Sequence, residues 1–229
     1  MYSTLRNNPR DYVTVVLEGN IGSGKTAVLE ALKRKHPEYT YIHEPLDAFC
    51  SFEKQDGTTL NPLQMFYANP ENAIITQLYF LDIYHKRVKD IETRDDLSKI
   101  IICDRWISSC RIFTDALRKC NHISAFAWEY FTRKYNETAK TLDFITPNAI
   151  YYVDTPVDVC LERQKLRGRE MEVNFIEMKT YLHELNICYD QMLNDIPSKY
   201  HIQKSSGISI TERVEEIEQL ISSMDIVRT

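Results

Sequence analysis

One octapeptide near the start of the chain has the residue types and the spacing of a phosphate-binding loop. It reads Gly19-Asn20-Ile21-Gly22-Ser23-Gly24-Lys25-Thr26 and matches the P-loop pattern G-x-x-x-x-G-K-[ST] at every position. Its glycines allow the backbone to curl so that N–H groups converge on phosphate oxygens. The pattern predicts that Lys25 reaches the β- and γ-phosphates of a nucleoside triphosphate and that the Thr26 hydroxyl ligates Mg²⁺.

The segments on either side are those that such a loop requires. Residues 12–18 are rich in β-branched apolar side chains, which predicts a strand, and residues 25–35 carry apolar residues at helical spacing. A helix that begins at the loop adds the positive end of its dipole. We therefore predict a nucleoside-triphosphate site, although ATPases, GTPases and small-molecule kinases all carry this motif.

Charged residues follow two other predicted strands, at the edge where α/β sheets bind their ligands. Glu44 follows residues 39–43 and precedes a proline that biases it toward an extended conformation. Its carboxylate can accept the proton of a hydroxyl that attacks the γ-phosphate. Asp104 follows residues 98–103, the usual place of a second Mg²⁺ contact, and Arg105 can stabilise the transferred phosphoryl group. A solvated glutamate and an aspartate N-cap are the structural alternatives.

Two further features could face these groups. Arg163 and Arg167 lie one turn apart on a predicted helix and a glycine follows them, which predicts a cationic lid over residues 163–175. An ordinary basic helix end is the alternative. Gln77 lies on or beside the apolar stripe of a predicted helix over 71–92, and its amide suits the edge of a nucleobase. A glutamine at the border of the stripe is the alternative there.

Length and composition limit the class of protein. With 229 residues, 43% of them hydrophobic, we expect one domain over 1–229. A net charge of −5 argues against nucleic acid as a partner. The six cysteines form no C-x-x-C pair, which favours reduced thiols. We find no apolar run of membrane-spanning length and no signal-peptide core, so we expect a cytoplasmic protein without a membrane partner.

The order of the predicted elements indicates the fold. Strands are predicted at residues 12–18, 39–43, 98–103, 148–153 and 199–203. Helical patterns lie between them, at 25–35, 61–68, 71–92, 105–119, 122–140, 156–167, 174–194 and 210–224. Strands that alternate with helices predict an α/β fold with a five-stranded parallel sheet and helices on both faces.

Taken in order along the chain, these motifs resemble the deoxyribonucleoside kinases, the family of deoxycytidine kinase, deoxyguanosine kinase, mitochondrial thymidine kinase and the insect multisubstrate enzyme. The resemblance covers nearly the whole chain and is carried by Gly19–Thr26, Glu44-Pro45, Leu63–Tyr67, Gln77, Asp104-Arg105, and Arg163–Arg169 with Glu172. It implies a P-loop nucleoside-kinase fold, ATP as phosphate donor, Mg²⁺, a deoxyribonucleoside acceptor and a homodimer.

The resemblance also implies roles at the reaction centre. Glu44 corresponds to the base that activates the 5′-hydroxyl of the acceptor, and Arg105 to the residue that holds this oxygen and the phosphoryl group. Lys25 is the catalytic lysine of the P-loop. Arg163 and Arg167 correspond to the arginines of the lid.

Other residues correspond to the acceptor pocket of the family. Tyr67 and Glu172 match the pair that binds the sugar 3′-hydroxyl, and Gln77 matches the bidentate reader of the base. Phe49 falls at the aromatic wall, and Phe113 at the ring that stacks on the base.

Two departures from the family pattern bear on specificity. The usual Glu-Arg-Ser is Asp104-Arg105-Trp106, which places a large ring beside the site. The deoxycytidine and purine kinases carry an Arg–Asp pair where this chain has Tyr84 and Cys110. A pocket without these charges favours pyrimidines of the thymidine type.

Two other functions remain as alternatives. A thymidylate kinase, which phosphorylates a nucleoside monophosphate, also has a P-loop, an Asp-Arg pair and an arginine-rich lid. The segment with Tyr67 and Gln77 matches the nucleoside kinases better. A GTPase-like switch requires an Asn-Lys-x-Asp segment, which the sequence does not contain.

Overall fold

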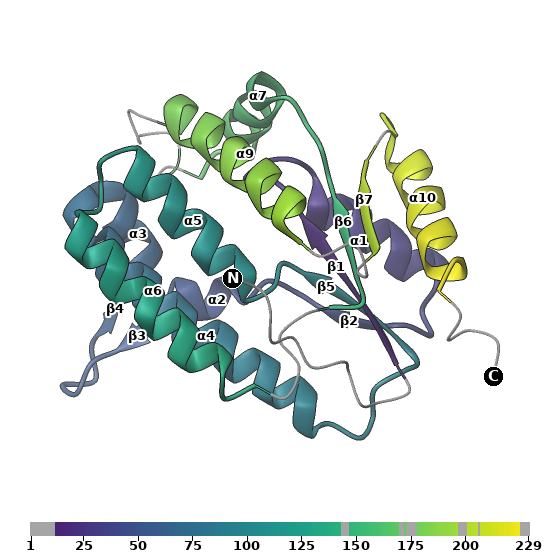
Figure 1. Cartoon of the computed structure of the whole chain (residues 1–229), viewed down its shortest axis with the longest axis horizontal. Coiled ribbons are helices and arrows are strands. Elements are labelled where there is room, and N and C mark those ends of the chain that lie inside the picture. The colour runs from purple at the N-terminus through teal and green to yellow at the C-terminus, as the bar shows by residue number, and fades with distance from the viewer. Residues whose placement is uncertain are drawn as a thin grey trace.

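The computed structural model describes residues 12–142, 147–169, 172, 178–196, 201–205 and 207–224. A central sheet has helices on both faces (Figure 1). Its five strands are all parallel and lie in the order β2-β5-β1-β6-β7, namely Thr40–Ile42, Ile100–Asp104, Val13–Glu18, Ala149–Tyr152 and His201–Lys204. The predicted fold class is therefore confirmed.

Helices of two groups cover the sheet. Buried side chains of α1 (Lys25–Lys35) and α10 (Ile210–Ser222) pack on one face. The other face is covered by α4 (Ala73–Thr93), α5 (Ser108–Lys119), α6 (Ala125–Ala139) and α9 (Met178–Asp195). The remaining elements are α2 (Leu46–Phe49), α3 (Pro62–Ala68), the 3₁₀ turn Pro70–Asn72, α7 (Val157–Arg167), and the hairpin of β3 (Phe52–Glu53) with β4 (Thr59–Leu60).

Strand β1 divides the core because its side chains alternate between the two faces. Val15 and Leu17 contact the α1 and α10 side, whereas Val16 packs under α4 and α5. All three are fully buried, and each such side chain contributes about 1.5–3 kcal/mol to folding. Glu18 is two residues after Val16, so the two side chains are on the same face of the sheet. The carboxylate of Glu18 therefore points toward the helices that cover this face.

The register places the ends of the middle strands at one level. Leu17 pairs with Asp104 of β5 and with Tyr151 of β6. The loops that follow these strands therefore emerge side by side at the carboxyl edge of the sheet. Parallel α/β sheets bind their ligands at this edge.

Local capping explains where several helices begin. Ser209 and Glu212 form a capping box at α10. Asn61 accepts a hydrogen bond from the backbone of Gln64 at α3, and Ser124 caps α6 in the same way. These caps satisfy N–H groups that would otherwise lack partners.

The predicted elements are present with shifted bounds. The helix predicted from residue 105 begins at Ser108, and the aspartate N-cap alternative is wrong because Asp104 ends β5 and Ile107 is the N-cap. Of the predicted strand 199–203, residues 201–203 lie in β7 and residues 199–200 lie outside the described part. The hairpin and α2 have no counterpart in the predicted elements, since strands of two residues and a four-residue helix give no periodic pattern.

Two whole-chain expectations can be compared with the structure. All six cysteines are free thiols, as expected. Among the described residues, no helix has the length and apolar character needed to cross a membrane.

The P-loop packs so closely on α7 that one glycine has no room for a side chain. Gly22 has φ +81, and a Cβ there would lie 2.6 Å from the carbonyl oxygen of Cys160. Gly57 has a similar φ of +79, but a Cβ there would meet nothing within 4 Å.

We predict that Gly22→Ala destabilises the fold more than Gly57→Ala. Both changes place alanine in a left-handed conformation, at about 1–2 kcal/mol, and only the first adds an overpacking cost of about 1–3 kcal/mol. Urea denaturation measures both free energies of unfolding. Equal losses in the two variants would contradict the packing argument.

Candidate active site

The P-loop is held by groups from distant parts of the chain. Asn20 donates to the carbonyl oxygen of Leu182 at 2.8 Å and to Oδ1 of Asn186 at 2.6 Å, both on α9. The carbonyl oxygen of Ser23 accepts hydrogen bonds from Thr155 at 3.0 Å and from Arg163 at 2.8 Å. The loop is therefore fixed between α7 and α9.

Lys25 lies at the start of α1 with its ammonium turned into the loop. Nζ donates to the carbonyl oxygens of Gly19 at 3.1 Å and of Asn20 at 2.9 Å. Burial, and next the charge of Arg105, lower the pKa of Lys25 to about 8. A phosphate beside this lysine would favour its charged form.

Thr26 and Asp104 form a pair suited to a magnesium ion. Thr26 Oγ1 lies 3.3 Å from Oδ2 of Asp104, while Oδ1 of Asp104 is buried and has no hydrogen-bond partner. No cluster of three or more His, Cys, Asp or Glu side chains occurs in the part of the chain that the structure describes. One carboxylate and one hydroxyl nevertheless fit Mg²⁺, which is commonly bound by one or two protein ligands together with phosphates and water.

Arg105 stands at the centre of the site in an unusual backbone conformation. Its φ of 61 lies in the left-handed region. Nε lies 3.0 Å from Oε1 of Glu44, so the two side chains form an ion pair. The geometry of this contact is not that of a hydrogen bond, and Nε has no hydrogen-bond partner. The guanidinium donates to the hydroxyl of Tyr189 at 2.6 Å and lies 4.8 Å from the ring centre of Phe113. Burial opposes the charge, but Tyr189, Glu44 and Glu18 hold the pKa of Arg105 well above its ordinary value.

Glu18 is a buried carboxylate that the sequence analysis missed. It is fully buried and accepts hydrogen bonds from Ser109 at 2.6 Å and from Tyr189 at 2.9 Å, and it lies 3.7 Å from Arg105. Burial raises the pKa of Glu18, although Arg105 acts in the opposite direction. One sequence signal could have revealed it: an acidic residue ends an apolar strand, at a position whose side chain is on the same face as that of Val16.

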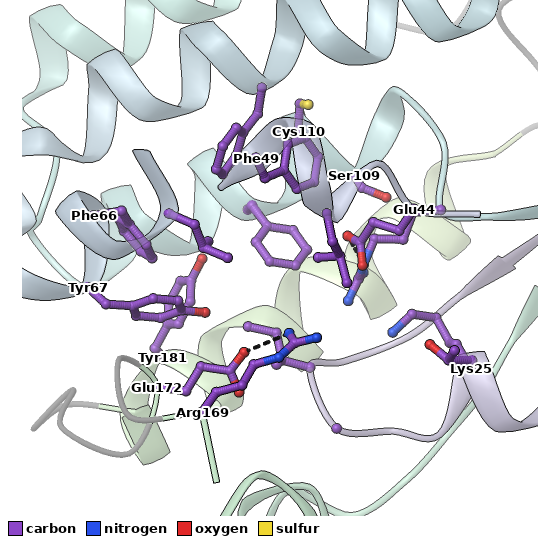
Figure 2. A pocket seen from close by; sticks show the side chains of 18 of the residues that line it. Lys25, Glu44, Phe49, Phe66, Tyr67, Ser109, Cys110, Arg169, Glu172 and Tyr181 are labelled. Carbon is purple, nitrogen blue, oxygen red and sulfur yellow. Dashed lines mark hydrogen bonds and ion pairs between the residues drawn. The ribbon is translucent and has the colours of Figure 1, made fainter. Parts of the chain in front are cut away.

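A cavity of about 260 Å³ joins the P-loop to the predicted acceptor residues. Figure 2 shows Lys25 and Glu44 at one end and the aromatic rings of Phe66, Tyr67 and Tyr181 at the other. All the predicted acceptor residues line it: Glu44, Phe49, Tyr67, Gln77, Tyr84, Arg105, Cys110, Phe113 and Glu172. On the donor side the lining includes Ile21, Gly22, Gly24, Lys25, Thr26, Arg163 and Arg167, whereas Gly19, Asn20 and Ser23 belong to the loop but not to the lining.

The acceptor end combines buried polar groups with aromatic walls. Gln77 is only 2% exposed, and it lines the cavity. Burial, and next the negative charge of Glu172, raise the pKa of Tyr67 above its usual value. Tyr67 and Glu172 line the same cavity, and Figure 2 shows both side chains on its aromatic side.

Glu172 is held by two arginines of the predicted lid. It forms an ion pair with Arg167 and another, of 3.2 Å, with Arg169 (Figure 2). Arg169 lines the cavity, and its contact adds it to the predicted site. Of the lid segment 163–175, residues 170–171 and 173–175 lie outside the described part of the chain.

Three further residues have contacts that the sequence analysis did not describe. Trp106 does not line the cavity itself but packs behind the lining, in one cluster with Phe49 and Tyr84. Tyr84 lies 3.4 Å from Glu44 Oε1 and packs on Phe49, with 5.5 Å between the ring centres. Arg213 of α10 donates to the Ser23 carbonyl oxygen at 3.4 Å, a contact that no sequence motif indicates.

Comparison with known proteins explains this arrangement. A family model described as deoxynucleoside kinase matches residues 15–227. The chain belongs to the deoxynucleoside kinase family. In this kinase one cavity joins the P-loop to the residues predicted to bind an acceptor.

Individual relatives are distant from this kinase. It is 25% identical to human mitochondrial thymidine kinase 2 over 175 residues, which cover 74% of the chain and 62% of the relative. It is 22% identical over 213 residues to a putative thymidylate kinase of Treponema pallidum (strain Nichols), covering 90% of the chain and 91% of the relative. The structure of deoxyadenosine kinase from M. mycoides with bound dATP superposes with a TM-score of 0.74 at 18% identity, covering 92% of the chain and 100% of that structure.

We predict that Glu18→Ala costs about 3–5 kcal/mol of stability, because it leaves the Arg105 guanidinium buried without one of its two carboxylates. Ser109→Ala is the matched control, since it removes one hydrogen bond to the same carboxylate and costs about 1–3 kcal/mol. Chemical denaturation compares the two variants. A loss in Glu18→Ala no larger than that in Ser109→Ala would show that the carboxylate is not needed as a counter-charge.

Proposed function

We propose that this kinase transfers the γ-phosphate of ATP to the 5′-hydroxyl of a deoxyribonucleoside, with pyrimidines favoured. The observation that carries the proposal is that Glu44 lines the same cavity as Lys25 and Thr26 of the P-loop and forms an ion pair with Arg105. A proton acceptor, a phosphate-binding loop and a fixed cation are the groups that this reaction uses.

The reaction follows from the positions of these groups. The 5′-oxygen attacks the γ-phosphorus as its proton passes to Glu44, a new O–P bond forms, and the bond to the β-phosphate oxygen breaks to release ADP. Arg105 stabilises the negative charge on the transferred group, and Lys25 binds the phosphates. Thr26 and Asp104 would hold Mg²⁺, which supplies neutralisation of the phosphate charge. Catalysis is thus mainly orientation and charge stabilisation.

The acceptor is recognised at the other end of the cavity. Gln77 presents an amide that donates and accepts at the edge of a base, and Phe49 and Phe113 supply aromatic rings to the same cavity. Tyr67 and Glu172 bind the 3′-hydroxyl of the sugar. A buried pair built for a hydroxyl discriminates against ligands that lack it, because its polar groups are then unpaired.

The preference for pyrimidines rests on Tyr84 and Cys110. Both side chains are buried and line the cavity, and burial holds their pKa values well above the ordinary ones, so both stay uncharged. A lining without charges at these two positions fits a thymidine-type base better than a base that is bound through an Arg–Asp pair. We further propose a single kinase domain over residues 1–229 in the cytoplasm. The resemblance to the family implies that it acts as a homodimer.

Replacement of the predicted base gives a direct prediction. Glu44→Gln keeps the shape of the side chain but cannot accept a proton, so we expect kcat to fall by about 10²–10⁴-fold while ATP binding persists. Steady-state kinetics and calorimetry with ATP measure the two properties. A variant with normal turnover would exclude Glu44 as the base.

The acceptor class is tested with a panel of natural nucleosides and ATP. We expect product from thymidine, deoxycytidine or deoxyuridine at higher kcat/KM than from deoxyadenosine or deoxyguanosine. Thymidine monophosphate is included because a thymidylate kinase would phosphorylate it in place of thymidine. Phosphorylation of the monophosphate alone would refute the proposed function, and faster turnover of purines would refute only the pyrimidine preference.

A further inference from the structure

Helix α4 carries two residues that face the acceptor cavity. Gln77 and Tyr84 are seven residues apart, about two helical turns, so they share one face of the helix. The proposed function uses Gln77 to read the base. Tyr84 continues the same face toward the P-loop end of the cavity, where Glu44 lies.

The hydroxyl of Tyr84 is placed to act on Glu44. The side chain is 3% exposed, and burial, followed by the charge of Glu44, holds the pKa of Tyr84 well above its ordinary value. Tyr84 therefore stays protonated and can donate. Its oxygen lies 3.4 Å from Oε1 of Glu44.

The ring of Tyr84 is fixed relative to the strands that carry the site. Arg87, one turn along α4, lies 5.6 Å from the ring centre. It donates to the carbonyl oxygen of Asp104 at 3.0 Å and to that of Ile42 at 2.9 Å. These bonds join α4 to the ends of β5 and β2, so the hydroxyl keeps its distance from Glu44.

An ion pair and a hydrogen bond converge on one oxygen of the Glu44 carboxylate. The guanidinium of Arg105 and the hydroxyl of Tyr84 both reach Oε1, and they come from different elements, the end of β5 and helix α4. Together they hold Oε1 in place. The second oxygen, Oε2, is then the one that can be presented to an acceptor hydroxyl.

We propose, on the basis of the proposed function, that Tyr84 is a positioning residue that holds Oε1 of Glu44 so that Oε2 receives the proton of the acceptor. The groups that act on Glu44 come from five elements: Lys25 of α1, Tyr67 of α3, Tyr84 of α4, Arg105 after β5, and Cys110 of α5. Among them, Tyr84 is the neutral donor with a hydrogen bond to the carboxylate.

Tyr84→Phe removes the hydroxyl and keeps the ring. We expect the single-turnover rate to fall about 10-fold, because the carboxylate loses a hydrogen bond and this bond is long. The acid side of the pH–rate profile should differ from that of the wild type, since the group proposed to accept the proton has lost a donor. The KM for the nucleoside should change by no more than about twofold, because the ring that lines the cavity remains.

Tyr79→Phe is the matched control. It makes the same change on the same helix, where the hydroxyl donates to the carbonyl oxygens of Ala48 and Ser51 and not to Glu44. Its rate and pH profile should equal those of the wild type. Thermal melting verifies that both variants fold.

A double-mutant cycle with Glu44→Gln separates a positioning role from a structural one. If Tyr84 acts through Glu44, Tyr84→Phe should have no further effect on the rate once Glu44 is glutamine. A full 10-fold loss in that background, or a wild-type profile in the single variant, would overturn the inference.

The ¹³C NMR signal of the Glu44 carboxyl tests the contact without turnover, with Glu44→Gln to assign the resonance. At fixed pH its chemical shift should differ between Tyr84→Phe and wild type, and it should be unchanged in Tyr79→Phe. Equal chemical shifts in all three proteins would overturn the inference even in an active enzyme. A wild-type chain that phosphorylates no nucleoside would refute the proposed function instead, and a changed chemical shift in Tyr84→Phe would still support the contact.

Discussion

The burial of one guanidinium determines how the carboxyl edge of the sheet is built. Moving a charge out of water costs several kcal/mol unless partners of opposite charge surround it. Arg105 meets this requirement with Glu18 from β1, Glu44 beyond β2 and the hydroxyl of Tyr189 on α9. Four separate segments of the chain must therefore come together before the charge is stabilised. One ion cluster thus fixes the positions of these four segments relative to one another.

The backbone at Arg105 follows from the same constraint. A left-handed conformation is unfavourable for a residue with a side chain, by about 1–2 kcal/mol. It ends β5 abruptly and turns the side chain under Phe113 and toward Glu44. The helix that follows starts only at Ser108, which leaves Asp104 at the end of the strand beside Thr26. The strained backbone at Arg105 thus separates Asp104, the proposed metal ligand, from the guanidinium that is proposed to stabilise the phosphoryl group.

Much of this was accessible from the sequence, because it is encoded locally. The strand before Gly19 and the helix after Gly24 follow from composition and periodicity, and the parallel sheet follows from their alternation. Glu18 could have been noticed as an acid at the end of an apolar strand, but no pattern in neighbouring residues shows that it accepts a hydrogen bond from Tyr189, 171 residues later. The contact of Tyr84 with Glu44 was likewise invisible, since it depends on how α4 lies relative to β2. The place of Trp106 behind the cavity lining, rather than in it, also depends on packing that the sequence does not reveal.

The hydrogen bond from Arg213 to the Ser23 carbonyl oxygen spans 190 residues and links the nucleotide loop to α10. The same guanidinium donates to the carbonyl oxygen of Asp154, so it ties the loop to the end of β6 as well. During synthesis the loop emerges from the ribosome early, but this support arrives only after α10 has been made. A nascent chain that stops short of α10 would present the whole P-loop motif without one of its anchors. The loop is therefore fully anchored only in a chain long enough to include α10.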